Sequence, residues 1–166
     1  MRLPARKKPP QLGFTLLELV VVIGILGVLS VSILPTSVDS NAFYTRGFHD
    51  ETLALLRYAQ KSAIAQRRRV CVEFSGSEGA SLRIAETAAT STCNQDLHGP
   101  AGGSNPIASI TAQSDVAYST PPNNFNFDGL GQPVDGSGSL AATQTIQVAN
   151  ASKSITIEAI TGYVHE

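Results

Sequence analysis

The stretch GFTLLELVVVIGILGVLS, residues 13–30, sets the organisation of the whole chain. It belongs to an apolar run of 21 residues, 14–34, in which Glu18 is the only charged side chain. At about 1.5 Å per helical residue, a run of this length can cross the roughly 30 Å hydrocarbon core of a bilayer. A carboxylate costs about 2.5–3.5 kcal/mol at the centre of such a helix, and less near the interface, so Glu18 needs a specific partner.

The basic charge of the chain is concentrated at its beginning. Residues 1–13, MRLPARKKPPQLG, contain no acid and four of the twelve basic residues, Arg2, Arg6, Lys7 and Lys8. The rest of the chain carries eight basic and thirteen acidic side chains, a net charge of −5. A basic segment before an apolar helix predicts that this end stays in the cytoplasm. The acidic remainder has no bulk attraction for nucleic acid or anionic lipid.

The apolar run is longer than a cleavable secretory signal requires. Such a signal has an apolar core of about 7–15 residues, followed by a cleavage site between small residues. Here the run extends over 21 residues to Leu34, and no polar break precedes its end. A helix that is retained in the mature protein is therefore favoured, and a signal that is removed remains the alternative.

The two cysteines, Cys71 and Cys93, both follow the apolar run and are expected outside the cytoplasm. In an oxidising compartment, two cysteines 22 residues apart favour a disulfide. In the chain-entropy model a loop of this size gives a stabilisation of about 3 kcal/mol. The spacing matches neither a metal site nor a redox CxxC motif. Two buried free thiols remain the alternative.

A second helix is predicted after Pro35. Apolar residues recur at helical spacing between residues 48 and 63, with charged residues on the opposite side. We expect this helix to begin near Ser37 or Asp50 and to end near Arg68. Because proline lacks an amide donor, Pro35 is expected to bend what would otherwise be one long helix.

Beyond residue 69 the periodicity changes to the alternation that is typical of strands. The segments VCVEF and SLRIAE, residues 70–74 and 81–86, predict a hairpin joined by SGSEGA. Residues 87–106 form a long polar loop, which a bond from Cys93 to Cys71 would tie down. The class predicted is α+β, with a long helix on an antiparallel domain of two small sheets. Further strands are expected at residues 107–112, 115–119, 125–127, 145–150 and 154–160.

A basic leader is followed by Gly13, Phe14, Thr15 and Glu18 at the start of an apolar run that leads to Pro35. This arrangement resembles the N-terminal motif of type IV pilins and type II secretion pseudopilins. The resemblance implies cleavage after Gly13 by a prepilin peptidase and methylation of the new Phe14 amine. It implies assembly of the apolar helices into a filament core. It also implies the pilin fold, a long N-terminal helix packed on an antiparallel sheet domain, with Pro35 as the kink.

Later segments resemble the GspH/FimT type of minor pilin. LRYAQKSAIAQRRRVCVEF, residues 56–74, is similar to that family's junction between the helix and the first strand. FDGLGQP contains Phe127 and Gly131, which match a Phe-x-x-x-Gly turn. Thr161 and Gly162 match a Thr-Gly pair near the C-terminus.

Residues 43–60 and the position of Cys71 also resemble MshC, a minor prepilin of mannose-sensitive haemagglutinin pilus systems. The resemblance implies a single-pass protein of the inner membrane with a periplasmic C-terminal domain, which later enters the filament. Four segments are expected: a leader at 1–13, a membrane and filament-core helix at 14–35, an amphipathic helix at 36–69 and a periplasmic β-rich domain at 70–166.

The function that the resemblance implies is structural. The chain would be a minor pilin or pseudopilin that initiates or tips a pilus or a type II secretion pseudopilus. Its partners would be a prepilin peptidase, the inner membrane and other major and minor pilin or pseudopilin subunits. The sequence contains no HExxH motif, nucleophile elbow or Walker phosphate loop, so we expect neither an enzyme nor a cofactor or metal site.

A filament would explain the charge of Glu18. An ammonium on a cleaved Phe14 and a Glu18 carboxylate about 4 Å away attract each other by roughly 4 kcal/mol at an effective dielectric constant of about 20. This is comparable with the cost of inserting the carboxylate, and the pair would fix the axial register between subunits. The alternative is a Glu18 that extends to the headgroups or is protonated.

Two other functions are open at this point. Arg67, Arg68 and Arg69 would suit DNA phosphates, as in a minor pilin for DNA uptake, although a solvated helix end is the commoner role of such a cluster. A plain single-pass membrane protein would stay uncleaved and would tolerate Glu18→Leu.

Overall fold

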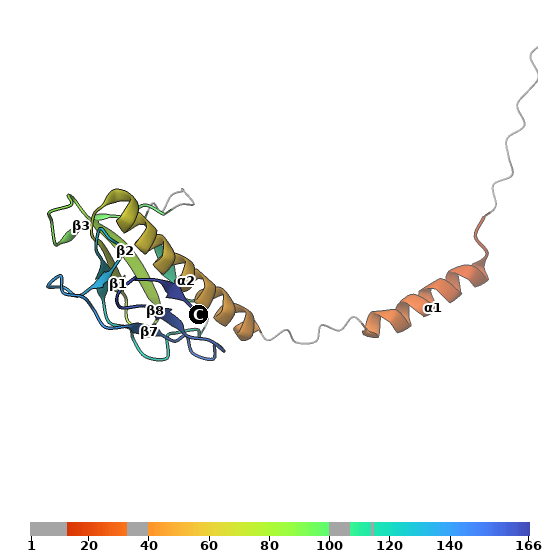
Figure 1. Ribbon diagram of the computed structural model, residues 1–166. Helices are drawn as coiled ribbons and strands as arrows, with labels where there is room; N and C mark the ends of the chain where they lie inside the picture. Colours follow the sequence, from red (N-terminus) through yellow and green to blue (C-terminus); the bar gives the residue numbers. More distant parts are fainter. Residues whose placement is uncertain (1–12, 33–39, 100–106, 114) are drawn as a thin grey trace, which may run out of the picture. The chain divides into compact units, whose positions relative to one another are not determined.

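The computed structural model describes residues 13–32, 40–99, 107–113 and 115–166 (Figure 1). The chain divides into two compact units, Met1–Val38 and Asp39–Glu166. The first unit contains helix α1 (Leu16–Ser32), and the second contains helix α2 (Ser40–Gln66) and all of the described strands.

Helix α1 is apolar on every side. Its 17 residues include one charged residue, Glu18, and every side chain described in it is exposed. Within the described residues, no helix combines the length and the apolarity needed to cross a bilayer. The predicted leader up to residue 12, the kink at Pro35 and the continuity of the two helices lie outside the described residues.

Helix α2 lies along the strands (Figure 1), and it buries one face against them. It runs for 27 residues through Gly47 and ends at Gln66, two residues before the predicted end at Arg68. The buried row recurs at helical spacing because one stripe of an amphipathic helix faces the core. The buried residues are Thr45, Phe48, His49, Thr52, Leu53, Leu55, Leu56, Ala59, Ser62 and Ala63.

The end of α2 is set by a left-handed residue. Arg67 has φ 50°, and its N–H donates to the carbonyl of Ile64 at 3.3 Å. The N–H of Arg68 donates to the carbonyl of Ala63 at 3.2 Å. These two bonds form a Schellman motif, which satisfies carbonyls that the helix leaves without partners. The chain then turns directly into the first strand.

The larger sheet is antiparallel, with the order β3-β2-β1-β5-β6, and β4 pairs with β2 beside β3. Its centre is the predicted hairpin of β1 and β2, in which Val70 lies opposite Ile84 and Val72 lies opposite Leu82. These four side chains are buried, because opposite residues share one face of a sheet. The strands are β1 (Val70–Phe74), β2 (Gly79–Ala85), β3 (Cys93–Asp96), β4 (Ser109–Thr111), β5 (Phe125–Phe127) and β6 (Pro133–Val134).

The smaller sheet has the order β7-β8-β9, made of β7 (Gln144–Ile146), β8 (Ile155–Ile157) and β9 (Val164–His165). Ile146, Ile155, Ile157 and Val164 join the same core as the buried face of α2. Two antiparallel sheets packed on one helix confirm the predicted fold class.

Two strand predictions were wrong. Residues 115–119 do not form a strand: Asp115 has φ 61°, outside extended geometry, and Tyr118 makes only a single bridge to Val148. Conversely, the predicted loop at 87–106 contains β3, whose sequence CNQD has no apolar alternation. Strand β3 forms by pairing with β2 rather than by its own propensity.

Candidate functional site

The residues of the predicted N-terminal motif surround the first turn of α1. Gly13, Phe14 and Thr15 precede the helix, and the Phe14 side chain is 82% exposed. The Glu18 N–H donates to Thr15 Oγ1 at 3.2 Å, so Thr15 caps the helix. A carboxylate in this first turn is also favoured by the helix dipole. Glu18 therefore has a local helix-starting role that the sequence analysis missed, although Thr-x-x-Glu is the spacing of a capping box.

The carboxylate of Glu18 has no hydrogen bond or ion pair to any described residue. Around it, Leu16 and Leu17 are 81% and 74% exposed, and no atom lies within 4 Å of a Cβ added at Gly24 or Gly27. Because the apolar side chains of α1 are exposed, the helix gains no stabilisation from removing apolar surface from water. The surface of α1 thus suits an apolar environment, with one acid available to an external cation.

Cys71 and Cys93 form the disulfide, with Cα atoms 6.1 Å apart. The bond joins β1 to β3, which lie on either side of β2. Because side chains alternate along a strand, Cys71 lies on the opposite face from Val70 and Val72. The disulfide therefore fastens the beginning of β3 on the side of the sheet that faces away from α2.

Three residues of the predicted turn motifs meet on α2 at Gln60. The Gln60 side-chain amide donates to the carbonyl of Gly131 at 3.3 Å and to that of Thr161 at 3.0 Å. Gly131 and Gly162 have φ of 82° and 64°, and a Cβ on Gly162 would overlap the Gly131 carbonyl oxygen. Glycine is thus required at Gly162 by both backbone conformation and contact.

Phe127 anchors the first of these turns. Its side chain is fully buried, with its ring centroid 5.3 Å from that of Phe125. The Asp128 carboxylate closes the turn by accepting from the N–H groups of Leu130 at 2.9 Å and Gln132 at 2.8 Å. These turn residues position loops rather than forming a reactive centre.

The arginine cluster is engaged in intramolecular hydrogen bonds. Arg68 donates to the carbonyl of Glu86 at 2.8 Å and to the Gln66 side chain at 2.6 Å. Arg69 donates to the carbonyl of Ser91 at 3.0 Å. Both side chains are half-buried, and Arg67 holds the left-handed position after α2. The cluster ends the helix and holds the following loops.

Charged pairs fasten the last strand. His165 Nε2 lies 2.9 Å from Glu158 Oε1, and this hydrogen bond raises the pKa of His165 above its ordinary value. The hydrogen bond between Lys153 and Glu166, at 2.7 Å, raises the pKa of the Lys153 ammonium and lowers that of the Glu166 carboxyl. No local pattern in the sequence indicates either pair.

The His165 pair predicts a pH-dependent stability. The pKa of His165 is higher in the folded protein than in the unfolded chain, so the protonated side chain stabilises the fold. This stabilisation is fully present below the pKa of the unfolded chain, about 6.5, and it is lost as the pH rises through the pKa of the folded protein. Glu158→Gln should therefore lower the Tm more at about pH 5.5 than at about pH 8.5. Lys153→Gln is the control, because the Lys153–Glu166 pair stays charged over this interval. An equal Tm decrease at both pH values for Glu158→Gln would contradict the prediction.

Comparison with known proteins adds two findings. Residues 8–34 match the prokaryotic N-terminal methylation motif. The fold is similar to the crystal structure of the type IV minor pilin FimU of Pseudomonas aeruginosa strain PAO1, with a TM-score of 0.51 and 14% identity over 76% of this chain and 90% of that one. The sequence has no significant match among curated proteins. The chain therefore has the fold of a type IV pilin and carries a prokaryotic N-terminal methylation motif at residues 8–34.

Proposed function

We propose that the chain is a minor type IV pilin or pseudopilin, a structural subunit rather than an enzyme. In this proposal a prepilin peptidase cleaves after Gly13 and methylates the Phe14 amine. Residues 14–35 anchor the chain in the inner membrane, with the C-terminal domain in the periplasm. The chain then enters a pilus or a type II secretion pseudopilus, which it initiates or tips. Among minor pilins, the sequence favours the GspH/FimT type and its MshC-like members.

One observation carries this proposal: the matched methylation motif leads into a helix that is apolar on all sides and whose single acid, Glu18, has no partner among the described residues. An apolar helix of this kind is stable in a bilayer or among other apolar helices. After cleavage, the Phe14 ammonium of one subunit supplies the cation that the Glu18 carboxylate of another subunit needs. In this proposal, the N-terminal segment alone accounts for processing, membrane anchoring and assembly.

The two alternative functions receive less support. A DNA-uptake pilin needs guanidinium groups free for phosphates, whereas Arg68 and Arg69 donate to the backbone of Glu86 and Ser91. A plain membrane anchor gives no reason for the match to a methylation motif, whereas a filament subunit does.

The N-terminal mass of the full chain tests the proposal. With a coexpressed prepilin peptidase, we expect a product that begins at methylated Phe14, and without the peptidase the intact chain. Gly13→Val should block the cut, whereas Gly24→Ala should be processed normally because no atom lies within 4 Å of the added Cβ. An intact Met1 in the presence of the peptidase, or a cut beyond Leu34, would overturn the proposal.

A further inference from the structure

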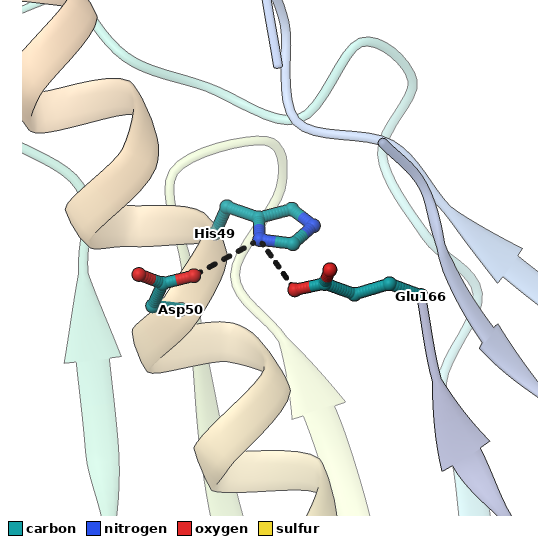
Figure 2. Close-up of side chains that lie close together, drawn as sticks. All are labelled: His49, Asp50 and Glu166. Carbon is teal, nitrogen blue, oxygen red and sulfur yellow. Dashed lines mark hydrogen bonds and ion pairs between the residues drawn. The ribbon is translucent and has the colours of Figure 1, made fainter. Parts of the chain in front are cut away.

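Three potential metal ligands from distant parts of the chain meet beside α2. His49 Nδ1 lies 3.4 Å from Asp50 Oδ1 and 3.9 Å from Glu166 Oε1. These three donor atoms lie within 4.8 Å of one another. They line a pocket of about 270 Å³ together with Arg46, Lys153 and two small residues. Figure 2 shows Nδ1 of the imidazole directed at both carboxylates. The sequence motifs had predicted no metal site.

The imidazole of His49 is unusual in being buried without good partners. Its side chain is only 8% exposed, and Nε2 has no hydrogen-bond partner among the described residues. Its Nδ1 makes only the two long contacts to the carboxylates. In the absence of a metal ion, Nδ1 can donate its proton to the Asp50 carboxylate. A metal ion at this position replaces the Nδ1 proton, and the Nδ1 lone pair then points into the pocket, as a metal ligand requires.

The carboxylates are arranged as ligands that differ in mobility. Asp50 is 74% exposed and free to adjust, whereas Glu166 is 28% exposed. Lys153 binds Oε2 of Glu166 at 2.7 Å, which orients this carboxylate and leaves Oε1 toward His49. A second group that orients a ligand in this way is common around metal ions. The two acids also offset the positive charges of Lys153 and Arg46.

The separations suit zinc. Zinc binds imidazole nitrogen and carboxylate oxygen at about 2.0–2.2 Å in tetrahedral geometry, which places neighbouring ligands roughly 3.4 Å apart. The Nδ1–Oδ1 separation of 3.4 Å already matches, whereas the 3.9 Å to Glu166 and the spread of up to 4.8 Å among the three atoms require side-chain rotation, which the exposed Asp50 permits. We propose that His49, Asp50 and Glu166 bind one zinc ion, with water as the fourth ligand. The ion joins α2 to the residue that follows β9.

Zinc binding by the full chain tests this site. The chain, without a histidine tag, is purified in detergent, stripped of metal and dialysed against increasing ZnCl₂, and bound zinc is measured by atomic absorption. We expect one zinc ion per chain. Asp50→Asn and Glu166→Gln should each weaken the affinity by at least about tenfold. Glu158→Gln should bind like the original chain, because Glu158 pairs with His165 outside the cluster.

A measurement of the Tm accompanies the dialysis. Zinc should raise the Tm of the original chain and of Glu158→Gln, because a ligand that binds only the folded state stabilises it. At the same zinc concentration it should raise the Tm of the Asp50 and Glu166 variants by less, and circular dichroism before zinc addition tests that both are folded. No saturable zinc binding, or equal binding in all four proteins, would overturn the proposal. In that case His49 serves only as a hydrogen-bond donor to Asp50.

Discussion

Gly162→Ala should lower the free energy of unfolding by about 3 kcal/mol. The added Cβ would occupy the position of the Gly131 carbonyl oxygen, which is backbone and has little freedom to move. Separating the two turns would also break the hydrogen bonds from Gln60 to Thr161 and from Gln132 to the carbonyl of Ile160. Each such bond contributes about 1 kcal/mol. Denaturant unfolding of the full chain, followed by circular dichroism, measures the loss.

Gly76→Ala is a matched control for this effect. Gly76 and Gly162 share φ of +64°, but no atom lies within 4 Å of a Cβ added at Gly76. Its substitution therefore measures the cost of the left-handed conformation alone, which is about 1 kcal/mol. Equal destabilisation by the two substitutions would show that the contact between the turns adds nothing.

Glu18→Leu should remove the chain from filaments while leaving it in the membrane. If the carboxylate pairs with the Phe14 ammonium of another subunit, an attraction of about 4 kcal/mol is lost. Because about 1.4 kcal/mol corresponds to a factor of ten, the incorporated fraction should fall by at least about tenfold. The helix itself should persist, because leucine has a higher helix propensity than most residues.

The measurement compares the chain in sheared filaments with the chain in the membrane fraction, by immunoblot in the source bacterium. Val20→Leu is the control, since it changes an exposed apolar side chain of the same helix and keeps the charge. Incorporation of Glu18→Leu at the level of Val20→Leu would show that the carboxylate has no role in assembly. The capping of α1 by Thr15 would then be the main consequence of this motif.

The parts of the fold that depend on local patterns could be predicted. The amphipathic spacing of α2 and the alternation of β1 and β2 reflect which faces are buried, and these elements formed where expected. The edge strand β3 could not be predicted, because its polar residues are extended only by pairing with β2. The strand expected around Tyr118 failed since a left-handed Asp115 breaks the extended chain.

The residues of the candidate site also fall into two groups: those that the sequence predicts and those that only the fold brings together. The N-terminal motif is contiguous in sequence, so its residues are recognisable without a structure. Gln60 carries no local signal for its role, because the two turns that it binds are distant along the chain. His49 and Glu166 likewise meet only through the packing of β9 beside α2. Contacts of this kind depend on tertiary structure, which no periodicity encodes.

The order of the larger sheet has a consequence for contacts between copies of the chain. Its outer strands are short: β3 has four residues and begins at the disulfide, β4 has three residues, and β6 has two residues and includes Pro133. Short, proline-containing or pinned edges offer few free N–H and C=O groups to a neighbouring sheet. The larger sheet therefore presents little edge to which a strand of another copy could be added.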